Sequence, residues 1–201
     1  MNNFQLKEFV SRKGKLISID GVHIGQTPKT IEFFTNLIQK NEFETIIEIG
    51  THKGGFTYFL NKVKPLNCKL VSFEINKKII EEQVLKENID IRIGDCFQET
   101  FKNQIKELLK NGKKSLILCD GGNKNKEFNT FSEFIKVGDI IMLHDYQHSS
   151  SLWKKYTQQA NWSFAPESSY KHIEQSVQKF SLKEYMYDEF CSTFWGCFTK
   201  K

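Results

Sequence analysis

The sequence predicts an α/β fold, in which a mostly parallel, seven-stranded sheet is covered by helices on both faces as a three-layer sandwich. From residue 27 onward, short apolar runs alternate with segments of helical periodicity, as parallel strands and crossover helices do. Near the C-terminus two strand-like stretches follow one another closely, so we expect them to pair antiparallel as a hairpin. With 201 residues, 39% of them hydrophobic, the chain is long enough for one domain with a substantial core.

The expected elements follow in chain order. A helix is predicted to begin at Pro28 with Thr27 as its N-cap. Five apolar runs are the predicted parallel strands: 45–50, 69–75, 89–95, 115–120 and 139–145. After each of the first four, apolar residues recur at helical spacing. A helix near residues 170–177 then leads to the two terminal strands, 182–190 and 192–200. This organisation gives a main domain at 27–201, preceded by a segment, 1–26, that we expect to act as a lid.

Composition excludes several classes of protein. No stretch approaches the roughly 20 apolar residues of a membrane span, so the sequence predicts a cytoplasmic protein without membrane contact. The five cysteines are odd in number and form no CxxC pair, which argues against a disulfide framework or a zinc cluster. The net charge is +5, but the lysines are scattered along the chain, and charge alone does not indicate a nucleic-acid partner.

A glycine-rich turn, EIGTHKGG, joins the first strand to the next helix at residues 48–55. A dinucleotide site would show GxGxxG, with a pyrophosphate at the helix N-terminus. Here Glu48 precedes the turn instead, and a carboxylate there suits a ligand with positive charge. Glu74 ends the second strand, where it could bind both hydroxyls of a ribose, and Asp95 ends the third. A single acid at a strand end is usually a helix cap, but three at successive strand ends indicate a ligand site.

With these residues the sequence resembles the class I S-adenosylmethionine-dependent methyltransferases, which have a Rossmann-like fold, over about residues 27–201. The resemblance implies S-adenosylmethionine as the cofactor. It implies that Gly50 and Gly54 approach the methionine part, and that Glu48 acts through water or the amino group. Glu74 would hold the ribose and Asp95 the adenine edge. The full set expected at the cofactor is Glu48, Gly50, Thr51, Gly54, Glu74, Asp95, Cys96 and Asp120.

The predicted acceptor site is at the ends of the fourth and fifth strands, where Asp120, His144 and Asp145 follow apolar runs. An alcohol acceptor must lose its proton, for which a base or a divalent metal can provide. The pattern also resembles metal-dependent O-methyltransferases of the macrocin and rhamnosyl type, together with the so-called cephalosporin hydroxylases. That subgroup has a Glu where this chain has His144, and often a His where it has Asn123. We therefore expect Asp120, His144 and Asp145 to be catalytic, and to hold magnesium, manganese or zinc if a metal binds.

Three further residues, Gln26, Tyr146 and His148, are predicted to contact the acceptor. The predicted reaction is methylation of a hydroxyl group on a small molecule, such as a sugar or a related natural product. Two alternatives stay open at this point: a nucleic-acid methyltransferase, which the scattered lysines make less favoured, and a non-catalytic protein that binds the cofactor or a partner. The sequence does not decide whether the chain forms a homo-oligomer.

Overall fold

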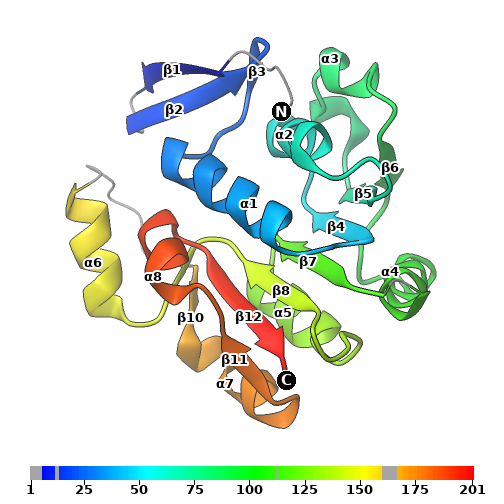
Figure 1. The fold of residues 1–201 in the computed structure, drawn as a ribbon, viewed down its shortest axis with the longest axis vertical. Coiled ribbons are helices and arrows are strands. Elements are labelled where there is room, and N and C mark those ends of the chain that lie inside the picture. The colour runs from blue at the N-terminus through cyan, green and yellow to red at the C-terminus, as the bar shows by residue number, and fades with distance from the viewer. Residues whose placement is uncertain (1–5, 12–13, 112, 160–166) are drawn as a thin grey trace.

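The computed structural model describes residues 6–11, 14–111, 113–159 and 167–201 (Figure 1). Its centre is a seven-stranded sheet in the order β11-β12-β8-β7-β4-β5-β6. Five strands run parallel: β4 (Thr45–Ile49), β5 (Lys69–Glu74), β6 (Asp90–Ile93), β7 (Ser115–Cys119) and β8 (Ile140–Leu143). The predicted α/β fold is confirmed. The last residue or two of each predicted strand lies beyond the ladder, in the turn that follows it.

Helices cover both faces of this sheet (Figure 1). On one face α1 (Pro28–Lys40) and α2 (Gly55–Val63) pack with α8 (Tyr187–Phe190), through Phe34, Phe59 and Phe190. On the other face are α4 (Glu99–Asn111), α5 (Lys124–Phe131) and α7 (Tyr170–Lys179), which bury an apolar core of their own. Consecutive strand residues alternate between the two cores, as Ile46 and Ile47 do, because strand side chains point to opposite faces. Helix α6 (Ser150–Gln159) follows the short strand β9 (Tyr146–Gln147).

The C-terminal strands confirm the predicted antiparallel pairing but not the tight connection. Strand β12 (Gly196–Lys200) pairs antiparallel with β8 and with β11 (Leu182–Glu184). Between β11 and β12 the chain forms α8 and the 3₁₀ helix η2 (Cys191–Thr193), where the two predicted strands, 182–190 and 192–200, were expected to continue up to a tight connection. Met186 and Phe194 flank this insert with φ values of 50° and 61°, which end the extended backbone on each side. The predicted hairpin is therefore a strand pair with a short helical excursion.

The connection after β5 also differs from the single helix that was expected there. It consists of the 3₁₀ helix η1 (Lys77–Ile79) and a four-residue helix, α3 (Glu82–Leu85). The sequence predicts a helix around Ile79, Ile80 and Val84; Ile80 and Val84 are buried, whereas Ile79 is 38% exposed. Two short strands, β9 (Tyr146–Gln147) and β10 (Ser168–Ser169), pair in parallel beyond the end of β8. No helix within the described ranges has the length and apolar character needed to cross a membrane.

The N-terminal segment forms a small antiparallel sheet of its own, which the sequence analysis did not foresee. Strands β1 (Leu6–Ser11), β2 (Gly14–Ile19) and β3 (Val22–His23) pair in chain order. Asp20 and Gly21 join β2 to β3 with φ values of 52° and 88°, as Asp-Gly does in a tight hairpin turn. The segment rests against α2, because a Cβ at Gly55 would lie 1.7 Å from the carbonyl oxygen of His23. Its role as a lid stays a prediction.

Candidate active site

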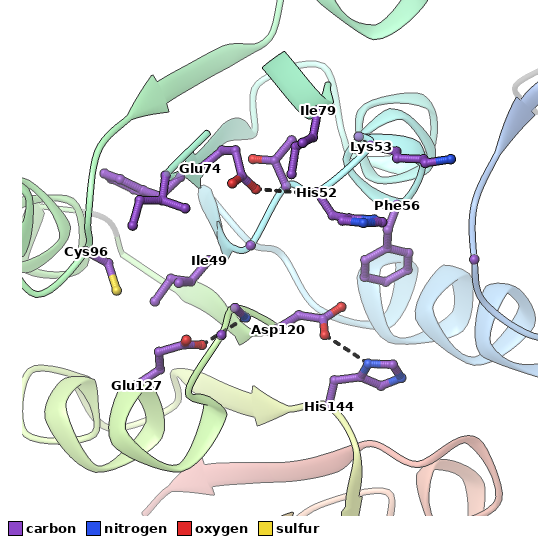
Figure 2. A pocket seen from close by; sticks show the side chains of 18 of the residues that line it. Ile49, His52, Lys53, Phe56, Glu74, Ile79, Cys96, Asp120, Glu127 and His144 are labelled. Carbon is purple, nitrogen blue, oxygen red and sulfur yellow. Dashed lines mark hydrogen bonds and ion pairs between the residues drawn. The ribbon is translucent and has the colours of Figure 1, made fainter. Parts of the chain in front are cut away.

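The turns at the carboxyl ends of the strands surround a cavity of about 1060 Å³ (Figure 2). Strand order reverses between β4 and β7, so the turns that follow these two strands diverge and leave a crevice, where open α/β sheets bind their ligands. The turns after β4, β5, β6, β7 and β8 all contribute to its lining, and residues 23–26 add a wall from the N-terminal segment. The cavity therefore joins the predicted cofactor site and the predicted acceptor site in one space.

The glycine-rich turn is shaped by close contact with the next strand. Gly50 has a φ of 96°, and a Cβ there would lie 2.3 Å from the carbonyl oxygen of Asp120. Gly54 has a φ of 88° and is the N-cap of α2. His52 also adopts a left-handed φ of 50°, so a residue with a side chain takes up a glycine-like conformation within the turn. Only glycine fits at position 50, because both its backbone angle and its neighbour exclude a side chain.

The acids at the next two strand ends are positioned by backbone N–H groups. The Glu74 carboxylate accepts hydrogen bonds from the N–H of His52 at 2.7 Å and of Asn76 at 3.0 Å (Figure 2). The Asp95 carboxylate accepts from the N–H of Phe97 at 2.9 Å. These contacts hold both carboxylates at the cavity wall. The structure brings most of the predicted cofactor residues to this cavity: Gly50, Thr51, Gly54, Glu74, Asp95, Cys96 and Asp120.

Glu48 lies beneath the glycine turn and not among the residues that line the cavity. Its side chain is 1% exposed and accepts hydrogen bonds from the hydroxyl groups of Thr57 and Ser72, both at 2.5 Å. Burial raises the pKa of this carboxyl to about 7, against the lowering effect of the two hydroxyl groups. Glu48 thus connects β4 to α2 and β5, and its predicted action on the cofactor stays a prediction.

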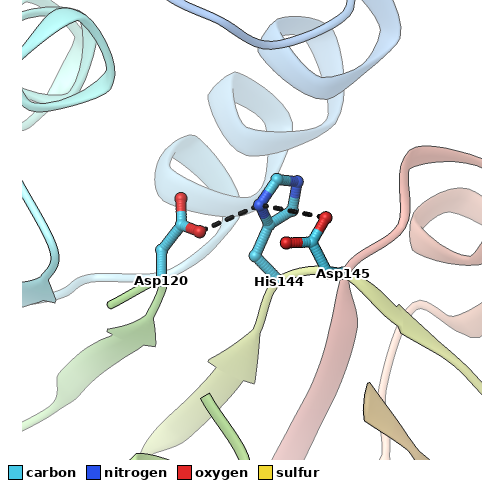
Figure 3. Close-up of side chains that lie close together, drawn as sticks. All are labelled: Asp120, His144 and Asp145. Carbon is cyan, nitrogen blue, oxygen red and sulfur yellow. Dashed lines mark hydrogen bonds and ion pairs between the residues drawn. The ribbon is translucent and has the colours of Figure 1, made fainter. Parts of the chain in front are cut away.

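The predicted catalytic residues come together at the ends of β7 and β8 (Figure 3). His144 Nδ1 lies 2.9 Å from Asp120 Oδ1 and 3.8 Å from Asp145 Oδ1. Burial lowers the pKa of His144, but the charge and the hydrogen bond of Asp120 outweigh it, so the pKa is raised. The imidazole stacks on the indole ring of Trp195, whose Nε1 donates to Gln26 Oε1 at 3.3 Å. The histidine is therefore held both by a carboxylate and by an aromatic ring.

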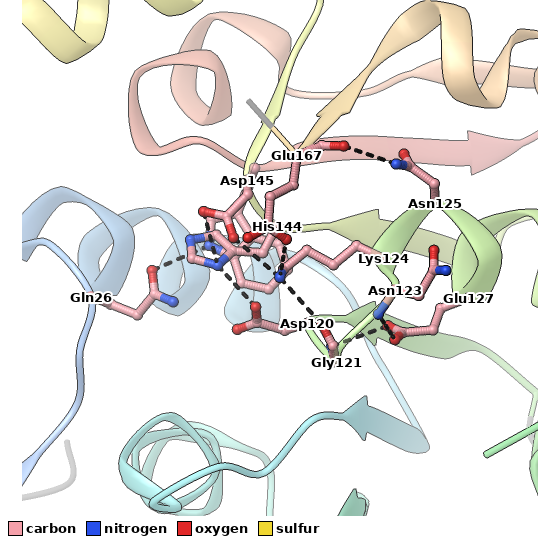
Figure 4. Close-up of polar contacts among 11 residues, drawn as sticks. Gln26, Asp120, Gly121, Asn123, Lys124, Asn125, Glu127, His144, Asp145 and Glu167 are labelled. Atoms are coloured by element: carbon pink, nitrogen blue, oxygen red, sulfur yellow. Dashed lines mark hydrogen bonds and ion pairs between the residues drawn. The ribbon is translucent and has the colours of Figure 1, made fainter. Parts of the chain in front are cut away.

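A buried lysine, one of the lysines scattered along the sequence and not predicted as a site residue, completes this cluster (Figure 4). The Lys124 ammonium lies 3.1 Å from Asp145 Oδ2, and donates to Glu167 Oε2 at 2.9 Å and to the carbonyl oxygen of Gly121 at 3.2 Å. Its side chain is 9% exposed. Burial lowers the pKa of Lys124, but the neighbouring carboxylates raise it by more. The pKa is therefore above its ordinary value, and the group is charged. The sequence feature that could have identified Lys124 as a site residue is its position four residues after Asp120, on the first turn of α5.

Asn123, which stands where the resembling subgroup often has a histidine, has a structural role here. Its side-chain oxygen accepts a hydrogen bond from the N–H of Lys126 at 3.1 Å and so caps α5. Glu127, also unforeseen, lines the cavity and accepts from the N–H groups of Gly121 and Asn123, both at 3.1 Å. Burial raises the pKa of Glu127 to about 7 despite these two donors. The side chain of Glu127, on α5, thus holds the loop after β7 in place.

Two of the three predicted acceptor residues lie away from the cavity lining. Tyr146 is buried and directs its hydroxyl group toward Glu184 at 3.4 Å. His148 contacts the same carboxylate through Nδ1 at 3.1 Å, and its ring stacks on Tyr170. Gln26 does line the cavity, as expected for a residue that reaches inward. Contact of Tyr146 and His148 with an acceptor stays a prediction that this arrangement does not favour.

The donor atoms suit a divalent metal by distance but not by charge. Asp120, His144 and Asp145 each offer one ligand atom, and these atoms all lie within 4.8 Å of one another. However, the Asp145 carboxylate is paired with Lys124, and His144 Nδ1 is engaged with Asp120. A divalent ion would have to displace the ammonium or lie close beside it. As arranged, these residues do not fit a metal, and the predicted magnesium, manganese or zinc stays untested.

Comparisons with known proteins identify the family and the fold. The family model described as FtsJ-like methyltransferase matches residues 14–156. A search of curated protein sequences finds no match. Among solved structures, CmcI in an apo structure is 15% identical with a TM-score of 0.65, and the match covers 91% of this chain and 75% of that one.

Two further structures show the same fold. A CmcI structure with magnesium and S-adenosylmethionine is 16% identical, with a TM-score of 0.61 and coverage of 90% of this chain and 75% of that one. An O-methyltransferase from Bacillus cereus, in complex with S-adenosylhomocysteine, is 16% identical, with a TM-score of 0.51 and coverage of 87% and 82%. At such identities the likeness shows the fold. Because the family model spans most of the chain, including the glycine turn and the His144–Asp145 pair, the protein belongs to the FtsJ-like methyltransferase family and is an S-adenosylmethionine-dependent methyltransferase.

Proposed function

We propose that the protein transfers a methyl group from S-adenosylmethionine to a hydroxyl group of a small molecule. The observation that carries the proposal is the 2.9 Å contact between His144 and Asp120, in the same cavity that the glycine turn lines. A hydrogen-bonded imidazole–carboxylate pair is the arrangement that can remove a proton from an alcohol. Methyl transfer to a hydroxyl group needs this step, because the neutral alcohol is a weak nucleophile.

The cofactor half of the cavity supports this assignment. When bound, S-adenosylmethionine supplies an electrophilic methyl group on a positively charged sulfur. Gly50 and Gly54 line the cavity, and because neither has a side chain a ligand can approach their backbone closely. The Glu74 carboxylate can accept hydrogen bonds from two ribose hydroxyl groups, and its own position is fixed by two backbone N–H donors. These features support S-adenosylmethionine as the cofactor of this cavity.

In the acceptor half, His144 takes the role of the general base. If Nδ1 carries the proton of the neutral imidazole, its N–H donates a hydrogen bond to Asp120. Nε2 then has the lone pair that receives the proton of the acceptor hydroxyl. The Asp120 carboxylate stabilises the imidazolium that results. The stack on Trp195 keeps the ring from rotating out of this geometry. Neither Asp145 nor Lys124 needs to gain or lose a proton in this scheme.

The charge of the acceptor end supports a small molecule over a nucleic acid. Three carboxylates, from Asp120, Asp145 and Glu167, line this end of the cavity, and Lys124 is the cation bound among them. A nucleic acid would bring its phosphate groups toward this acidic rim, whereas nucleic-acid sites depend on basic residues that neutralise the backbone. A neutral polyol, such as a sugar, carries hydroxyl groups without that repulsion.

The proposal is tested by measuring S-adenosylhomocysteine release with a panel of sugars and phenolic alcohols, and with total RNA in parallel. An alcohol that is turned over by the wild type, with product loss in His144→Gln, supports it. His148→Gln is the matched control and should keep its activity, because that residue does not line the cavity. Calorimetric titration with S-adenosylhomocysteine verifies that each variant still binds the cofactor. Methyl incorporation into RNA alone, or full activity of His144→Gln, contradicts the proposal.

A further inference from the structure

We propose that the Lys124 ammonium is a built-in cation, which stands where a divalent metal would otherwise bind beside the acceptor site. The site would accordingly work with His144 as base and without a metal. This inference rests on the proposed function, because it concerns how the same acceptor site is organised. It depends mainly on the contacts of Lys124, whereas the reaction is assigned from the pair of His144 and Asp120.

The geometry around Lys124 is that of a cation site with the cation supplied by the chain. Its nitrogen contacts three oxygens: Asp145 Oδ2 at 3.1 Å, Glu167 Oε2 at 2.9 Å, and the carbonyl oxygen of Gly121 at 3.2 Å. An ammonium has three N–H donors, so these contacts use all of them. The three oxygens come from the loop after β7, the end of β8 and the segment before β10 (Figure 4). A metal ion bound to these oxygens would likewise connect three segments that are separate in the chain.

Burial makes this arrangement persistent. The Lys124 side chain is 9% exposed, and a buried ammonium is retained only where carboxylates and carbonyl groups replace its water. Lys124 extends from the first turn of α5, whose start is fixed by the Asn123 cap. The neighbouring Asn125 adds a second link, since its Nδ2 donates to the carbonyl oxygen of Glu167 at 2.9 Å. The backbone of Lys124 is thus fixed by the start of α5, and the segment that carries Glu167 is held beside its ammonium group.

The charges leave little for a divalent ion to neutralise. Asp145 and Glu167 share the ammonium, and Asp120 is hydrogen-bonded to His144. An ion bound to Asp145 and Asp120 would lie close to a positive charge, which opposes binding in a partly buried site. Lys124 is therefore a positioning residue: it holds Asp145 and Glu167 at the rim, and it excludes a metal from the same carboxylates.

The test is Mn²⁺ binding, followed by the loss of the free-ion signal in electron paramagnetic resonance. The wild type should leave Mn²⁺ free, whereas Lys124→Met should bind about one ion, at least about 100-fold more tightly than the wild type. Lys126→Met is the matched control, an exposed lysine on the same helix that does not contact the cluster, and it should behave as the wild type. Lys124→Arg keeps the charge and should also leave Mn²⁺ free.

The wild type alone can overturn the inference, even if Lys124→Met does not fold. Tight binding of one Mn²⁺ by the wild type, lost in Asp145→Asn, would show that the site is a metal site. Failure of a folded Lys124→Met variant to bind Mn²⁺ would also overturn it, since the carboxylates would then not need a cation. Titration with S-adenosylhomocysteine reports folding. No acceptor is present in these measurements, so the metal question and the methyl-transfer question can fail separately.

Discussion

The indole ring of Trp195 stacks on the imidazole of His144, with ring centroids 4.7 Å apart and planes inclined by 29°. The same indole donates its N–H to Gln26, at the end of the N-terminal segment. Trp195 thus connects three distant parts of the chain: the segment before α1, the end of β8 and the approach to β12. It is 1% exposed, so this connection lies within the core.

We expect Gln26→Leu to test this connection with the least disturbance. The substitution leaves the buried indole N–H without its acceptor and should lower the free energy of unfolding by about 1–3 kcal/mol. Urea unfolding measures this loss.

Trp195→Phe removes the donor as well as part of the ring, and should also reduce the turnover rate by loosening His144, with cofactor affinity unchanged. An unaltered turnover rate in a folded Trp195→Phe variant would show that the stack does not position the base.

Replacement of Gly50 should affect stability and cofactor binding together. Gly50→Ala combines a positive φ with a clash against the Asp120 carbonyl oxygen. Gly138→Ala is the matched control, because Gly138 has a φ of 87° with nothing within 4 Å of the added carbon. The control should lose about 1–2 kcal/mol of unfolding free energy from backbone strain alone. Gly50→Ala should lose more and bind S-adenosylhomocysteine weakly or not at all; equal losses would contradict the steric argument.

Glu74→Gln should weaken the binding of S-adenosylhomocysteine by about tenfold or more. A glutamine side chain has one acceptor oxygen, so it cannot serve the N–H groups of His52 and Asn76 and also receive two ribose hydroxyl groups. Calorimetric titration provides the affinity. Glu82→Gln, on the exposed surface of α3, is the control and should bind as the wild type does. An unchanged affinity in Glu74→Gln would show that Glu74 does not bind the ribose of the cofactor.

The buried carboxyl of Glu48 should make the protein less stable as the pH rises. Its pKa is raised to about 7 in the folded state, from an ordinary value of 4.5, so the folded chain retains a proton that the unfolded chain releases. Stability from this group is complete below pH 4.5 and is lost as the pH rises to about 7, with a total on the order of 3 kcal/mol. Glu127 adds a loss of the same sign.

Urea unfolding at pH 5 and pH 8 measures this dependence. Glu48→Gln should show a smaller difference between the two values than the wild type, because its amide does not titrate and its oxygen still accepts from Thr57 and Ser72. A double variant with Glu127→Gln should reduce the difference again. If Glu48→Gln keeps the full difference, the pKa of Glu48 is not raised in the folded protein.

The central sheet could be predicted because each strand is a run of buried apolar residues between polar turns. Its carboxyl ends meet at one edge by topology alone, which explains why Glu74, Asp95 and Asp120 could be placed at one cavity. The N-terminal sheet was missed although Asp20-Gly21 is a hairpin signal. The α8 insert could not be seen, because it depends on two residues with positive φ that carry ordinary side chains.

The parts of the site that were missed depend on burial, which a single sequence does not reveal. Lys124 resembles any other lysine in the sequence, and its role appears only where Asp145 and Glu167 converge on it. Tyr146 and His148 were assigned to the acceptor because they follow His144 and Asp145 in the chain. In the fold, Glu184 on β11 contacts both of them and draws them away from the cavity.

The contact between Gly50 and the Asp120 backbone also limits how this protein can evolve. The turn that receives the cofactor and the strand end that activates the acceptor share one wall, with no space for a side chain between them. A change on either side of that wall disturbs both halves of the reaction at once. Selection for a new acceptor would therefore act on the outer parts of the cavity, at residues 23–26 and around Glu167, where substitutions leave the shared wall intact.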